Sequence, residues 1–183
     1  RHTVEGGLPD DLRRRVHRRW ATMLEGEAGE AGEDVALLHA ALEHRRAGGL
    51  PALDLAIRIA RSPGRRSLGP AGLSLLGSIA DEADPADSLR TDLVEAIASL
   101  AAEVADQRLA LGRWTSLAAD LPPGPRRVRA LVGAARAAFD LREPEIARGL
   151  VARASAERPA PVEALRIEAL EAEREREHEE SKS

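Results

Sequence analysis

Apolar residues recur along this chain at steps of three and four, which is the spacing of side chains on one face of a helix. The pattern is clearest within residues 128–161. Two sets of mostly small residues there each share a helical face: Leu131, Ala134, Ala135 and Ala138, and then Ala147, Val151 and Ala154. Pro144 separates the sets, because the residue before a proline is forced out of the α region and proline can open the next helix. Residues 128–161 are therefore predicted to form an antiparallel helical hairpin, closed by Pro159.

The first third of the chain contains one predicted helix and a second predicted hairpin. Pro9, Asp10 and Asp11 favour a helix start, and Gly26–Gly32 predicts a polar loop after this helix. The apolar stripe of the helix consists of Leu8, Leu12, Val16, Trp20 and Met23 or Leu24. The hairpin is predicted over 34–67, with its turn at Gly48–Gly49 and the end of its second helix at 62–64.

The remaining segments are predicted from the same spacing. A helix is expected over 70–83, while 86–111 fits either one long helix or two helices broken near Ser99. Gly112 is expected to precede a short helix that bears Trp114. The last helix is expected to begin at Pro161, with these residues on one face: Val162, Leu165, Ala169 and Ala172. Residues 1–8 are a polar lead-in, and 173–183 are expected to be a solvated or fraying charged tail.

Composition supports an all-α fold. Apolar residues make up 43% of the chain but aromatic residues only 2%, so Leu, Ala, Val and Ile must fill the core, and no stretch alternates with a period of two. The net charge of −4 gives no overall attraction to nucleic acid or to anionic membranes. There is no Cys, no apolar run of membrane-spanning length and no signal peptide, so a cytoplasmic location is expected. Since the first residue is Arg1, we expect the chain to be a piece of a longer protein.

The 128–161 hairpin resembles the tetratricopeptide repeat (TPR), in which large and small residues recur at these positions of two helices and a proline closes the unit. Leu131, Ala138 and Val151 stand where that family usually has aromatic residues, and in the partial match over 34–67 His44 replaces one. The resemblance implies antiparallel helical hairpins in a right-handed solenoid, with a single α-helical domain over 9–172. It also implies a non-catalytic scaffold that binds a protein or peptide.

In TPR proteins the partner lies in a concave groove that first-helix residues line beside the packing stripe. The resemblance therefore implies that these residues bind the partner: Arg129, Val132, Arg136, Phe139, Arg45 and Arg46. Arg129 and Arg136 are seven residues apart and lie on one helical face, so they could hold a carboxylate or an acidic peptide while Phe139 contacts an apolar anchor.

Two alternatives concern the Arg-rich first helix. Arg14–Arg19, followed by a His-bearing helix and a glycine turn in Leu37–Gly49, is similar to the helical segment after the ATPase module of bacterial STAND-type regulators. That resemblance implies an intramolecular sensor or regulatory arm of a signalling ATPase. The cluster Arg13–Arg19 could instead contact the phosphates of a nucleic acid, and this is the less favoured alternative.

Candidate chemistry is sparse, so we expect neither an enzyme nor a cofactor. The chain has no phosphate-binding glycine loop of either common type. His39 and His44 are five residues apart, about 140° around a helix, and so they diverge instead of sharing a metal ion. No arrangement of Ser, His and Asp on one helical face suggests a nucleophilic site.

Overall fold

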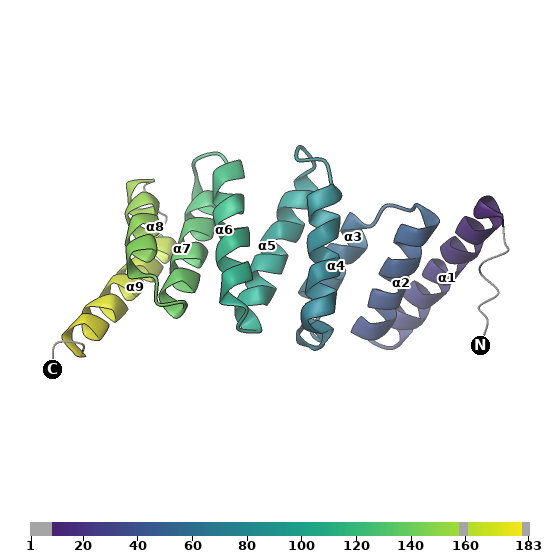
Figure 1. Ribbon diagram of the computed structural model, residues 1–183, viewed down its shortest axis with the longest axis horizontal. Helices are drawn as coiled ribbons and strands as arrows, with labels where there is room; N and C mark the ends of the chain where they lie inside the picture. Colours follow the sequence, from purple (N-terminus) through teal and green to yellow (C-terminus); the bar gives the residue numbers. More distant parts are fainter. Residues whose placement is uncertain (1–8, 158–160, 181–183) are drawn as a thin grey trace. The chain divides into compact units, whose positions relative to one another are not determined.

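A computed structural model describes residues 9–157 and 161–180; the predicted lead-in 1–8 and Pro159 lie outside the described residues. Over the described residues it contains nine α-helices, one 3-10 helix and no strand, which confirms the all-α class (Figure 1). The helices are α1 (Asp10–Glu30), α2 (Val35–Gly48), α3 (Leu53–Arg61), η2 (Arg65–Leu68, the 3-10 helix), α4 (Gly69–Glu82), α5 (Ser88–Glu103), α6 (Gln107–Asp120), α7 (Pro125–Asp140), α8 (Pro144–Ala156) and α9 (Pro161–Glu180). The chain forms two compact units, Arg1–Ala96 and Ile97–Ser183, and the boundary between them falls inside α5.

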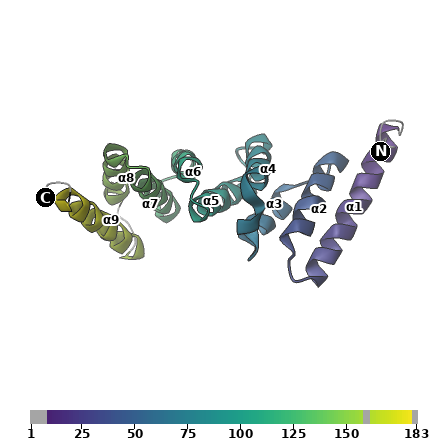
Figure 2. The same ribbon diagram turned by 60° about the horizontal axis from the view of Figure 1, so that its bottom comes forward.

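In the first unit, α1 and α2 lie side by side as an antiparallel pair (Figures 1 and 2). Small side chains on α1 and larger ones on α2 form the contact, and all of them are completely buried: Ala21 and Ala28, and then Leu38, Ala41 and Leu42. Because alanine projects little beyond the helix backbone, the two helices can approach closely along this contact.

Local chemistry sets both ends of α2. The side chain of Asp34 accepts hydrogen bonds from two backbone N–H groups of the first turn, at 2.8 and 3.2 Å. At the other end, Gly49 adopts the left-handed conformation with φ of 67°, and the N–H of Leu50 donates to the carbonyl of Arg45 at 2.9 Å. The predicted turn at Gly48–Gly49 is confirmed.

The loop predicted over Gly26–Gly32 is wrong for most of its length, because α1 continues to Glu30. Ala28 is completely buried on the packed face of α1. A glycine inside a helix costs only about 1 kcal/mol relative to alanine, so packing can carry a helix across two of them. The chain turns only at Gly32 and Glu33, which have φ values of 72° and 71°.

The rest of the first unit packs around α3 and α4. Leu55 and Ile59 of α3 and Leu76 of α4 are buried, with at most 2% of their surface exposed. After α3, the buried hydroxyl of Ser62 donates a hydrogen bond to the carbonyl of Ile59 at 2.8 Å. The predicted helix end at 62–64 is therefore confirmed.

Residues 86–111, which the sequence allows to form one helix or two, form two: α5 and the start of α6. The break lies at 104–106 and not near Ser99, and Gly112 lies inside α6 instead of preceding a helix. Asp106 explains the position of the break, because its carboxylate accepts a hydrogen bond from a first-turn N–H of α6 at 3.1 Å. The cap at Asp106 was therefore a stronger signal for the start of a helix than Ser99 or Gly112.

In the second unit, the hairpin predicted over 128–161 is formed by α7 and α8. All seven residues of its two predicted faces are buried, and none has more than 6% of its surface exposed. The other side of α7 packs against α6 at Gly133 and Trp114. A Cβ atom built on Gly133 would lie only 2.7 to 2.9 Å from three atoms of the Trp114 indole ring.

The last helix, α9, contacts α7 and α8 through a different face from the one predicted. Val162 and Leu165 are 58% and 66% exposed, while Ile167 and Leu170 are buried. The sequence of α9 places apolar residues on two different faces. The face with Ile167 and Leu170, near the middle of the helix, packs against the rest of the second unit. The backbone of α9 continues through Glu180, so the predicted charged tail is helical over 173–180, and residues 181–183 lie outside the described residues.

Candidate protein-interaction surface

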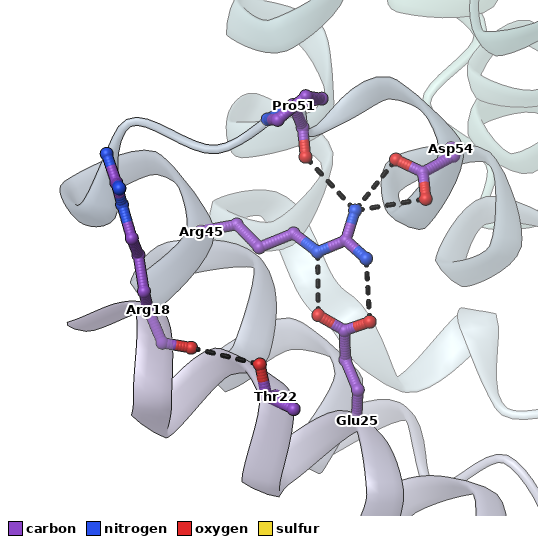
Figure 3. A network of polar contacts seen from close by, with 6 residues as sticks. All are labelled: Arg18, Thr22, Glu25, Arg45, Pro51 and Asp54. Carbon is purple, nitrogen blue, oxygen red and sulfur yellow. Dashed lines mark hydrogen bonds and ion pairs between the residues drawn. The ribbon is translucent and has the colours of Figure 1, made fainter. Parts of the chain in front are cut away.

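A network centred on Arg45 ties together α1, α2 and the start of α3 (Figure 3). Its Nε and Nη2 atoms donate to the two carboxylate oxygens of Glu25 at 2.6 and 2.7 Å. Its Nη1 atom donates to Asp54 at 2.8 Å and to the carbonyl of Pro51 at 3.0 Å. The hydrogen bonds to Glu25 are the main reason why the pKa of Arg45 is raised above its ordinary value. Arg45, which the TPR resemblance implies as a partner-binding residue, is thus engaged within its own unit.

Arg46 and Arg18 make three further polar contacts between helices of the first unit. Arg46 donates to Glu82 of α4 at 2.7 Å and to Ser78 at 3.2 Å. Arg18 of α1 donates from Nε to the carbonyl of Gly48 at 2.8 Å. The Arg18 contact and the Arg45–Glu25 pair therefore join α1 to α2, while the Arg46 contacts join α2 to α4.

A bidentate ion pair joins the turn after α1 to α3. Arg58 donates from Nε and Nη2 to the two carboxylate oxygens of Glu33, both at 2.6 Å. These hydrogen bonds from Arg58 lower the pKa of Glu33 below 4.5. They also hold a non-glycine residue in the left-handed conformation.

The Glu33–Arg58 pair predicts a pH dependence of stability. The carboxylate form is favoured in the folded state, so the pair stabilises the fold above about pH 4.5, and the contribution is lost as the pH falls through the lower folded-state pKa. We expect Glu33→Gln to lower the free energy of unfolding at neutral pH, and the difference from wild type to shrink below pH 4.5. Urea denaturation over a pH series measures this difference. The control Glu43→Gln removes an exposed carboxylate of α2, and an equal trend for both variants would contradict the assignment.

The outer side of α1 carries four large apolar side chains that the fold leaves partly uncovered. Leu12, Val16, Trp20 and Met23 are 39%, 40%, 46% and 42% exposed, and their spacing of four, four and three places them on one side of the helix. We call these four residues the α1 face. They belong to the predicted apolar stripe of the first helix, but α1 packs on α2 through Ala21 and Ala28 instead.

Charged side chains border the α1 face unevenly. Towards its N-terminal half lie Arg13, Arg15 and Arg19; Arg15 pairs with Asp11 at 3.0 Å, and Arg13 approaches Asp10 at 3.7 Å. Arg19 is exposed and makes no ion pair with the described residues. The last part of α1 carries acids instead, with Glu27 and Glu30 exposed.

The ring of His44, which contacts His17, lies against the ring of Trp20. The Nδ1 atoms of His17 and His44 lie 2.7 Å apart, and the ring of Trp20 stacks on His44 with 6.1 Å between centroids. One side of the indole is therefore fixed by the protein, while nearly half of its surface faces solvent. His39, named above with His44, takes no part in this cluster. The described residues contain no group of three or more His, Cys, Asp or Glu side chains placed to hold a metal ion.

The residues implied by the TPR resemblance on α7 differ in their burial. Val132 is only 9% exposed and belongs to the core of the second unit, while Phe139 is half-buried. Arg129 and Arg136 are exposed, and Arg136 lies 3.6 Å from Asp140 on the next turn. The structure brings Arg129 and Arg136 to one side of α7 and leaves their proposed role in binding a partner as a prediction.

Comparison of the chain with protein-family models, with curated proteins and with solved structures finds no match. Within the part of the chain that the structure describes, no helix is both long enough and apolar enough to cross a membrane. The TPR and STAND resemblances stay predictions, and the proposals below rest on the geometry of the described residues.

Proposed function

We propose that this chain is a non-catalytic protein-interaction module that docks an amphipathic helix with acidic flanks on the α1 face. The observation that carries the proposal is the side-by-side exposure of Leu12, Val16, Trp20 and Met23. Single exposed apolar residues are ordinary on protein surfaces, whereas a contiguous group that includes a tryptophan is typical of binding sites. Residues at this spacing can receive the apolar positions of a second helix.

The charges beside the α1 face indicate the chemistry of the partner. Arg15 and Arg19 are one helical turn apart along one edge of the face, and Arg13 lies at the opposite edge. Arginine forms charge-assisted, bidentate hydrogen bonds with carboxylates. A partner helix with glutamates beside its apolar stripe therefore complements this surface, and a basic helix is repelled.

The test uses a fluorescent, designed helical peptide with leucines on one face and glutamates on its flanks, and a matched peptide with lysines in place of the glutamates. Fluorescence anisotropy should show binding of the acidic peptide at least about tenfold tighter at low salt, with the difference shrinking as salt screens the charges. Val16→Glu should abolish binding. Leu89→Glu, which changes an equally exposed apolar residue on α5, should leave it unchanged.

A second candidate surface is the concave face that the TPR resemblance implies. Its support is the exposure of Arg129 and Arg136 two turns apart on α7, beside the half-buried Phe139. The same peptide assay distinguishes the two surfaces. Loss of binding in the double variant Arg129→Glu/Arg136→Glu, with Val16→Glu still binding, would move the site to α7 and overturn the proposal for α1.

A further inference from the structure

We propose that the helix docked on the α1 face is α1 of a second copy of this chain, lying antiparallel and crossing near Trp20. The inference rests on the proposed function, because it names the partner of the same surface. It commits to a two-fold symmetric contact in which both copies use identical residues, the arrangement found in most homodimers.

The charge distribution along α1 carries the inference. Its first half bears five arginines at Arg13, Arg14, Arg15, Arg18 and Arg19, and its last turns bear Glu25, Glu27 and Glu30. Glu25 is occupied by Arg45, while Glu27 and Glu30 are exposed. In an antiparallel pair the basic half of each copy lies beside the acidic end of the other, and the helix dipoles also oppose each other favourably. Thus α1 is itself an amphipathic helix with acidic residues next to an apolar stripe.

The positions of Arg13, Trp20 and Glu27 determine which side chains of the two copies lie together. Arg13 and Glu27 each lie seven residues from Trp20, on either side of it. Seven residues advance about 10 Å along a helix and rotate to within about 20° of two full turns, so the three side chains share one side of α1. If two copies cross at Trp20, Arg13 of each copy lies beside Glu27 of the other.

The apolar residues fit the same arrangement. Leu12 and Val16 precede Trp20, and Met23 follows it. An antiparallel copy that crosses at Trp20 covers Val16 with its own Met23 and the half-buried Leu24, while Leu12 lies opposite residue 28 at the edge of the contact. Trp20 lies at the centre, where tryptophan contributes most to interfaces. The length of α1, 21 residues or about 31 Å, makes this contact smaller than a standard protein interface. The dimer is therefore expected to be weak and to depend on concentration.

The experiment is sedimentation equilibrium of the whole chain over a range of concentrations at low salt. The average mass should rise from 19.6 kDa towards twice that value. Arg13→Glu should weaken the dimer at least about tenfold, since it places two carboxylates together, and Glu27→Arg should do the same. The double variant Arg13→Glu/Glu27→Arg should restore the dimer, because each copy then carries the reversed pair. Arg153→Glu on α8 makes the same charge change as Arg13→Glu and should have no effect.

Three results would overturn the inference: a wild-type chain that stays monomeric at all concentrations, a dimer that survives Trp20→Glu, or a double variant that regains nothing. Circular dichroism of each variant must show wild-type helicity, so that loss of the dimer is not loss of the fold. The peptide assay separates this failure from failure of the proposed function. A monomeric chain that still binds the acidic peptide refutes only the second-copy partner, whereas a chain that does neither refutes both.

Discussion

Gly133→Ala is expected to destabilise the second unit by about 2 kcal/mol, although alanine is the better helix former by about 1 kcal/mol. The added methyl carbon would lie 2.7 Å from Cε2, 2.8 Å from Cδ2 and 2.9 Å from Nε1 of the Trp114 indole ring. These atoms belong to a rigid ring that is only 7% exposed, so it cannot bend away as a flexible side chain would. Either α6 and α7 must separate or Trp114 must leave its rotamer. Chemical denaturation followed by circular dichroism measures the change.

Gly149→Ala is the matched control for this prediction. Gly149 lies in α8, and a Cβ atom there meets no atom within 4 Å. The substitution should therefore stabilise the unit by about 0.5–1 kcal/mol through helix propensity alone. Combining Gly133→Ala with Trp114→Leu should cost less than the sum of the two single variants, since the smaller side chain makes room for the methyl group. If Gly133→Ala were as stable as Gly149→Ala, the close approach of α6 and α7 would be disproved.

Arg45→Ala is expected to destabilise the first unit by about 2 kcal/mol. Arg45 and Glu25 are only 18% and 21% exposed, and removing the arginine leaves the carboxylate of Glu25 poorly solvated and without its two hydrogen bonds. Asp54 and the carbonyl of Pro51 lose their contacts with the same side chain. Thermal and urea unfolding of the variant measure the loss.

Arg46→Ala is the control, because Arg46 and Glu82 are 35% and 62% exposed and solvent screens their ion pair. Its expected cost is below about 1 kcal/mol. Replacing both Arg45 and Glu25 with Met should recover part of the stability, since no poorly solvated carboxylate remains. Equal losses for Arg45→Ala and Arg46→Ala would show that the Arg45 network has no special role in joining α1 to α2.

The sequence predicted those parts of the fold in which strong local signals coincide. Pro144 after a run of small residues marks the α7–α8 hairpin, and Gly49 marks the end of α2 because a left-handed residue is required there. The signals were weaker at Gly26 and Gly112, where tertiary packing or an aspartate cap decided the outcome. Glycine alone does not distinguish a loop from the interior of a helix.

Burial was harder to predict than helicity. In α1 the large residues that define the apolar stripe are exposed, and two alanines seven residues apart, Ala21 and Ala28, form the packed face. The sequence does contain this signal, since small residues repeated at that interval are typical of closely packed helices. In α9 two faces carry apolar residues, and the sequence did not indicate which of them would be buried. The partners of Arg45 could not be predicted, because Glu25 and Asp54 approach it only after three helices have packed.

The way in which α1 is attached has a consequence for its local stability. Only Ala21 and Ala28 of α1 are completely buried, so its apolar contact with α2 is narrow and is supplemented by Arg45, Arg18 and the contact between His17 and His44. Such an element can open by itself, without unfolding of α2 or α3. A ligand that binds only the closed form opposes this opening in proportion to its concentration and affinity. Docking on α1 would thus be measured as slower amide hydrogen exchange along this helix.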